Sequence, residues 1–173
     1  TLQALRCTFQ WNTATAGTAG ALYLGANSVN TITDCLIDEN TASSHGAGVW
    51  IGTTTTATMS GTTFSNNIGY YGGGVYTSTT CTLIMSGMTF FSNTGRYGGG
   101  AMYIATNNVL TMSASNITGN VVTTSGHGGG INLVGANIVA SIATTYIRNN
   151  RAFTTGYGGG IYAPTVNTVL KLT

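Results

Sequence analysis

A glycine-rich motif that returns at a nearly fixed interval is the strongest constraint on how this chain can fold. The clearest copies span residues 69–76, 95–103, 126–131 and 156–162, and looser copies span 18–22 and 45–50. The last glycine of each copy marks an expected bend, and successive bends lie 26 to 30 residues apart: Gly20, Gly48, Gly74, Gly100, Gly130 and Gly160. An interval of this length is typical of solenoids and other stacked repeats.

One asparagine column and one apolar column keep the same interval. A Phe/Ile-x-x-Asn pattern occurs six times and ends in Asn12, Asn40, Asn67, Asn93, Asn120 and Asn150. Five residues before each Phe or Ile stands an apolar residue: Ala4, Ile32, Met59, Met85, Met112 and Ile142, with Leu172 in phase for a seventh copy. The pattern predicts an all-β fold, a parallel β-helix of six turns plus one strand. We expect three short strands in each turn and one domain over residues 1–173.

The low charge of the chain narrows the range of partners. Charged residues make up 5% of the sequence and hydrophobic residues 42%, which suits a folded β surface of Thr, Ser and Asn rather than a disordered chain. The net charge of +2 comes from basic residues that are too scattered to form a patch, so we expect no nucleic-acid partner: Arg6, Arg96, Arg148, Arg151 and Lys171. No apolar run reaches the roughly 18 residues of a membrane-spanning helix.

The repeated residues have structural roles in this interpretation. Stacked asparagines can hydrogen-bond from one turn to the next, so the asparagine column predicts a structural ladder rather than a ligand site. The glycine column predicts a bend with positive φ at its last residue, and Gly74→Val is therefore expected to unfold or strongly destabilise the protein. The apolar residues that follow the glycines should point inward: Ala21, Val49, Val75, Ala101, Ile131 and Ile161.

A column of rings stands three residues before the last glycine of five copies: His45, Tyr71, Tyr97, His127 and Tyr157. Rings in register on stacked turns attract one another by about 1 kcal/mol per pair. Two interpretations remain open for this column. A packed spine that covers the glycine bend is favoured over a platform for sugars or for the surface of a partner.

Catalytic and metal-binding residues are scarce. The only acidic residues are Asp34, Asp38 and Glu39, all within one turn, whereas enzymes that cleave polysaccharides need clustered carboxylates. Neither the Cys/His spacing of a zinc site nor a repeated Asp for calcium is present. We therefore expect no enzymatic activity, no metal and no cofactor.

Three cysteines leave one question open. Cys7 and Cys35 share a column on adjacent turns, at a spacing that a disulfide tolerates. Two small apolar residues in equivalent sites are favoured over a bridge, and Cys81 has no counterpart. Asn116-Ile117-Thr118 is a weak glycosylation sequon.

The pairing of Gly-Gly-Gly-Ile/Val-Tyr with Phe-x-x-Asn resembles the repeats of chlamydial polymorphic outer-membrane proteins and related right-handed parallel β-helix surface proteins. The two motifs cover essentially the whole chain, although the copies at Ala19-Gly20-Ala21 and Gly46-Ala47-Gly48 depart from the glycine triplet. In that family the repeats form an exported passenger that is often an adhesin. The resemblance implies a right-handed β-helix, an extracellular or cell-surface location and a non-enzymatic role.

Two functions from different classes follow as hypotheses. In the first, the chain stacks head to tail with copies of itself into a filament or surface fibre. Its ends are expected to continue one repeat without a cap, with this interface: Leu2, Ala4, Leu170 and Leu172.

In the alternative, the chain is a passenger-type adhesin that binds a glycan or protein on a host or neighbouring cell through its variable loops. A third and weaker hypothesis is ice or mineral binding by a flat threonine face. Ile84 interrupts the column of Thr31, Thr58 and Thr111 on that face, so the match to a regular lattice is poor.

Overall fold

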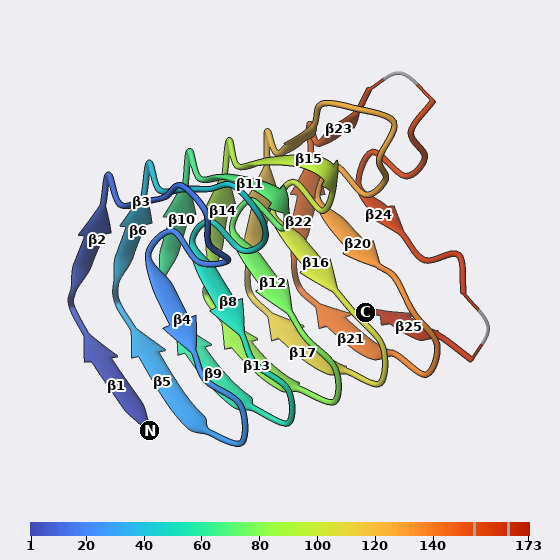
Figure 1. Cartoon of the computed structure of the whole chain (residues 1–173). Helices are drawn as coiled ribbons and strands as arrows, with labels where there is room; N and C mark the ends of the chain where they lie inside the picture. Colours follow the sequence, from blue (N-terminus) through green and yellow to red (C-terminus); the bar gives the residue numbers. More distant parts are fainter. Residues whose placement is uncertain (154, 166) are drawn as a thin grey trace.

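The chain winds into a parallel β-helix in which every turn adds one strand to each of four sheets (Figure 1). This computed structural model describes residues 1–153, 155–165 and 167–173. The described residues form 25 short strands, and none of their segments is a helix long and apolar enough to cross a membrane. We number the turns by the first sheet, so that turn 1 begins at β1 and turn 7 at β25. All strand pairs are parallel and join consecutive turns.

Two of the four sheets carry the apolar columns found in the sequence. Sheet A has seven strands: β1 (Leu2–Leu5), β5 (Val29–Thr33), β9 (Thr56–Ser60), β13 (Thr82–Ser86), β17 (Val109–Ser113), β21 (Val139–Ala143) and β25 (Val169–Leu172). Sheet B follows it: β2 (Thr8–Gln10), β6 (Leu36–Asp38), β10 (Thr63–Ser65), β14 (Thr89–Phe91), β18 (Asn116–Thr118) and β22 (Tyr146–Arg148).

The other two sheets lie on either side of the glycine motif. Sheet C precedes the glycines: β3 (Thr13–Ala14), β7 (Thr41–Ala42), β11 (Ile68–Tyr71), β15 (Thr94–Gly98), β19 (Val121–Val122) and β23 (Arg151–Ala152). Sheet D follows them: β4 (Leu22–Leu24), β8 (Val49–Ile51), β12 (Val75–Thr77), β16 (Met102–Ile104), β20 (Ile131–Leu133) and β24 (Ile161–Tyr162). The expectation of three strands per turn was therefore wrong. Sheet C was missed because most of its strands have only two residues, too few to show an alternating pattern.

Each of the first six turns has four corners, and each corner places one residue in the left-handed region, except the corner between sheets C and D of turn 1. Between sheets A and B these residues are Arg6, Asp34, Gly61, Gly87, Ala114 and Thr144. Between sheets B and C they immediately precede the asparagine column: Trp11, Glu39, Asn66, Ser92, Gly119 and Asn149. Between sheets D and A they are Asn27, Thr54, Thr80, Asn107, Asn137 and Asn167. These three corners tolerate side chains, as single left-handed residues can.

The corner between sheets C and D is different because only glycine occupies its left-handed position: Gly46, Gly72, Gly99, Gly128 and Gly158. This result corrects the predicted bend. The positive φ belongs to Gly72, with φ 64°, and not to Gly74. A Cβ on Gly72 would clash with the Val75 carbonyl oxygen, so glycine is required there for both its conformation and its space.

Gly74 is constrained by close packing alone. A Cβ at Gly74 would lie 2.7 Å from the Ala101 carbonyl oxygen and 3.1 Å from the ring of Phe90. The strand register also corrects the alignment of two turns, since Leu22 pairs with Val49 and Val75 with Met102. The position of Gly74 is therefore filled by Ala21 in turn 1 and Ala101 in turn 4, instead of Gly20 and Gly100.

One inserted residue explains the shift in turn 4. Gly69 pairs with Gly95, but Tyr71 pairs with Gly98, and the register changes between these two pairs. The extra residue lies in the arch before the glycines and leaves sheet A in step, where Met85 pairs with Met112. Counting back from the glycine triplet could not detect it.

The core is one continuous apolar column inside the four sheets. Ile32, Met59, Met85 and Met112 enter it from sheet A, and Phe64 and Phe90 stack inside it with ring centroids 4.9 Å apart. Of the residues expected to point inward after the glycines, Val49, Val75, Ala101 and Ile131 are fully buried, and Ala21 and Ile161 are partly buried. This single core is continuous along the helix, and one domain over residues 1–173 stays a prediction.

Three glycine variants distinguish the stability cost of a left-handed backbone conformation from the cost of a steric clash. Gly72→Ala is expected to lower the free energy of unfolding by about 2 kcal/mol or more, because it adds left-handed strain to a backbone clash. Gly74→Ala should cost about 1 to 2 kcal/mol, since alanine already fills the equivalent positions of two other turns. Gly25→Ala is the control, because nothing lies within 4 Å of its added Cβ. Urea unfolding measures all three, and an order in which Gly74→Ala costs more than Gly72→Ala would refute the assignment.

Candidate functional site

The six asparagines lie directly after the corner between sheets B and C and stack into a ladder inside the helix. Each Oδ1 after the first accepts hydrogen bonds from the backbone N–H and the Nδ2 of the asparagine one turn earlier. Each Nδ2 after the first also donates to a sheet B carbonyl of the preceding turn, as Asn93 does to Phe64 O at 2.9 Å. The buried amides are thus fully bonded within the protein, which leaves them no donor or acceptor for a ligand.

Removing one amide from the middle of the ladder should be costly. Asn93→Leu would leave the Asn67 backbone N–H unpaired and would remove one hydrogen bond each from Asn67 Nδ2, the Phe64 carbonyl and Asn120 Oδ1. We expect a loss of about 3 kcal/mol or more in the free energy of unfolding, measured with denaturant. Asn12→Leu is the matched control at the exposed first rung and should cost about 1 kcal/mol or less. Equal costs at the two positions would show that the ladder contributes little.

A row of outward rings on sheet D is the most prominent surface feature, and the sequence interpretation overlooked it. Tyr23, Trp50, Tyr76 and Tyr103 occupy the same strand position in turns 1 to 4. Their ring centroids are 4.4, 6.5 and 5.3 Å apart in that order, and neighbouring planes are within 16° of parallel. The signal was present in the motif, because the aromatic residue stands directly after the inward apolar residue.

The predicted ring column lies beside this row and is partly as expected. His45 pairs with Tyr71, and their rings stack at 5.4 Å. Tyr97 was placed in the column wrongly, because the inserted residue puts Gly98 there, paired with both Tyr71 and His127. The ring of Tyr97 instead packs on Tyr70, with centroids 4.3 Å apart.

We call the combined area the aromatic surface: Tyr23, His45, Trp50, Tyr70, Tyr71, Tyr76, Tyr97 and Tyr103, continued in turns 5 and 6 by His127, Tyr157 and Tyr162. At Gly98 the Tyr103 ring lies against the glycine arch, 3.3 Å from where a Cβ would stand, while the spine interpretation as a whole stays a prediction. Asn132 replaces the ring of turn 5, is only 2% exposed, and has an Oδ1 without a hydrogen-bond partner in the described structure.

Stacking along the helix axis determines which parts of the rings reach solvent. Trp50 and Tyr76 have neighbours on both faces, so they present edges rather than faces. Burial raises the pKa of Tyr76 and raises the pKa of Tyr103 to about 12. Their phenols therefore stay neutral at physiological pH, with each hydroxyl able to donate and accept a hydrogen bond.

His45 makes the stability of this surface sensitive to acid. Burial lowers the pKa of His45 below its ordinary value of 6.5, so the unfolded chain takes up a proton at this site more readily than the folded protein. Stability from the neutral ring is complete above pH 6.5 and is lost as the pH falls through the lower, folded value. We expect the melting temperature to fall from about pH 8 to about pH 5, and to fall less in His45→Phe. An identical pH profile for this variant would remove His45 as the cause.

The described residues offer few groups for metal or acid–base chemistry, apart from the hydrogen bond between the Ser44 hydroxyl and His45 Nδ1. No set of three His, Cys, Asp or Glu side chains among them could hold a metal ion. Asp38 accepts hydrogen bonds from Gln10, Ser65 and Asn66, at 2.8, 2.6 and 3.0 Å, and is used structurally. All three cysteines are free, so the bridge between Cys7 and Cys35 is absent from this structure, and burial raises the pKa of the Cys81 thiol.

The family model for the right-handed β-helix region matches residues 3–169. The chain belongs to the right-handed β-helix family. Comparison with curated proteins and with solved structures gave no match. The family membership agrees with the coarse part of the resemblance drawn from the repeats, and it gives no support to a specific relationship with the chlamydial proteins.

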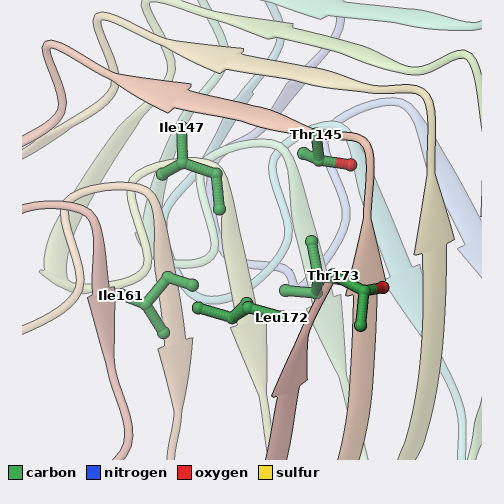
Figure 2. A pocket seen from close by; sticks show the side chains of 6 residues that line it. Thr145, Ile147, Ile161, Leu172 and Thr173 are labelled. Carbon is green, nitrogen blue, oxygen red and sulfur yellow. The ribbon is translucent and has the colours of Figure 1, made fainter.

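In this right-handed β-helix the core opens at turn 6 into an apolar hollow of about 490 Å³ (Figure 2). Ile147, Ile161 and Leu172 line it together with Ile142, Thr145 and Thr173. Leu172 is 60% exposed. Of the other predicted interface residues, Leu2 and Leu170 are half-buried against the core. Ala4 was expected to be part of this interface. It is only 5% exposed, so its side chain belongs to the core instead.

Proposed function

We propose that this chain is a non-enzymatic recognition module, in the manner of an adhesin, that acts outside the cell or at the cell surface. The observation that supports this proposal most is the aromatic surface, which spans all six turns on sheets C and D. Tyrosine and tryptophan are enriched at protein interfaces because they combine a large apolar area with a polar group. A parallel β-helix presents such a row on a stiff support.

The stacking geometry favours a protein partner over a glycan. A sugar ring packs its C–H face against an open aromatic face, and the inner rings of the row are covered on both faces. What they present is a series of edges and neutral hydroxyl groups at intervals of one strand. Ring edges and hydroxyls suit the backbone carbonyls and aromatic side chains of another protein.

The non-enzymatic role is supported by the disposition of the polar residues. The ladder amides are bonded to one another, Asp38 is held by three hydrogen bonds, and the three acidic residues are confined to turn 2. The aromatic surface itself carries no carboxylate.

Adhesion of coated beads to cultured epithelial cells tests the proposal and the class of partner. Beads carrying the protein should bind, and treating the cells with trypsin should abolish binding while periodate oxidation of their glycans should not. The double variant Tyr23→Ser/Tyr97→Ser should reduce adhesion about tenfold or more, because both rings are exposed members of the aromatic surface. Phe91→Ser is the control, an exposed ring on sheet B outside this surface. Loss of adhesion with periodate alone would indicate a glycan partner and refute a protein one.

End-to-end assembly is a second candidate, supported by the hollow and by the charge distribution. The hollow exposes apolar side chains at one end of the helix (Figure 2). Arg6 lies in turn 1 and the three acidic residues in turn 2, whereas Arg148, Arg151 and Lys171 lie in turns 6 and 7, so the charged side chains sum to −2 (+1 − 3) in the first two turns and to +3 in the last two. Opposite charge at the two ends would favour a head-to-tail approach of two copies.

Light scattering of the purified protein tests assembly. Particle mass should rise with protein concentration, and electron microscopy should show fibres. Leu172→Lys should prevent this by placing a charge in the apolar hollow. Leu5→Lys is a matched control, because Leu5 is 62% exposed, against 60% for Leu172, but points outward from sheet A. A monomer at all concentrations would rule out assembly and leave the recognition module.

A further inference from the structure

We propose that a groove outside sheet B, at turns 4 to 6, binds a sugar ring that carries a carboxylate group. The groove has a volume of about 480 Å³, within the range of small-ligand sites. It lies along β14, β18 and β22, away from the aromatic surface, and is independent of the proposed protein partner. Its lining is Gly87, Met88, Thr89, Ala114, Ser115, Asn116, Thr144, Tyr146 and Arg148.

Differences in side-chain size between successive turns create the groove. The corner before sheet B holds Gly87, Ala114 and Thr144 in these turns, so little side chain fills the space outside the corner. Tyr146 occupies the same strand position as Asn116 one turn earlier and Thr89 two turns earlier, and it projects as a wall at one end. The result is a shallow floor of small polar groups bounded by one large ring.

Tyr146 provides the ring face that the aromatic surface lacks. Its side chain is 69% exposed, and among the described residues no other aromatic ring stacks on it. The face of a phenol ring is electron-rich, and it attracts the weakly positive C–H groups on one side of a pyranose. Tyr146 can therefore hold a sugar in the way that Trp50 and Tyr76 cannot.

Arg148 supplies the charge that selects an acidic sugar. It follows Tyr146 by two residues on β22, so both side chains point outward. Its guanidinium carbon lies over one face of the Tyr146 ring, 5.8 Å from the centroid, which leaves the other face to a sugar. No carboxylate lines the groove, and the three acidic residues in turn 2 are about 10 to 19 Å away along the helix axis. At that distance salt screens most of their attraction, which leaves the guanidinium to pair with a ligand carboxylate.

Asn116 gives the third contact. Its Oδ1 is buried in the described structure without a hydrogen-bond partner, an unusual state for a buried polar atom. No hydrogen bond of the described residues holds the amide, so it can turn and offer both an acceptor and two donors to neighbouring sugar hydroxyls. An apolar ligand would leave this amide and Arg148 unpaired, and a small inorganic anion would make no use of Tyr146.

Binding of glucuronic acid, glucose and acetate to the intact chain, followed by NMR or calorimetry, tests the proposal. Glucuronic acid should bind with a dissociation constant of about 1 mM, and glucose and acetate at least about fivefold more weakly. Arg148→Gln should reduce the affinity for glucuronic acid to that for glucose, and Tyr146→Ser should abolish binding of both sugars. Arg151→Gln removes the same charge one strand away, over the ring of Phe153, and should leave binding unchanged.

Three outcomes would overturn the proposal. They are no saturable binding of glucuronic acid, acetate bound as tightly as glucuronic acid, or an equal loss of affinity in Arg151→Gln. Tyr146 and Arg148 are exposed, so thermal melts should show both variants folded. The aromatic surface is untouched by these substitutions, and failure here would leave the adhesion experiment unaffected.

Discussion

Hydrogen bonding between turns, with equivalent residues held in register, is the constraint on which the whole structure depends. Each strand pairs only with the same strand of the next turn, about 4.8 Å away, so a residue in one turn lies directly over its counterpart. A polar side chain in the interior is therefore tolerated only if its neighbours above and below can bond to it. The asparagines meet this condition, because an amide both donates and accepts along the stack.

The same stacking explains why the residues of the glycine arch have small side chains or none. The backbone of one arch lies against that of the next, and a Cβ on Gly73 would lie 2.5 Å from the Gly100 carbonyl oxygen. At Gly98 an added Cβ would also lie 3.3 Å from the Tyr103 ring, so a side chain there would meet the aromatic surface.

The sequence predicted the features that repeat in every turn and missed those that vary. The asparagine column occurs six times without exception, so its place at one corner could be read directly. Three consecutive glycines give no sign of which one has positive φ, and only the structure assigns it to Gly72. The row formed by Tyr23, Trp50 and Tyr76 was hidden because the first two belong to the degenerate copies of the motif. The groove beside Arg148 could not be predicted, since it arises from unlike side chains in neighbouring turns.

The single inserted residue in the arch of turn 4 shows where this architecture accepts a change in chain length. Between Gly95 and Gly98 the chain bulges, yet the asparagine ladder before it and sheets D and A after it keep their pairing. The arch therefore tolerates an inserted residue without a change in the strand pairing of the neighbouring sheets. Lineages carrying this fold could diversify there first, and a foreign loop grafted at the same place would be displayed beside the aromatic rings.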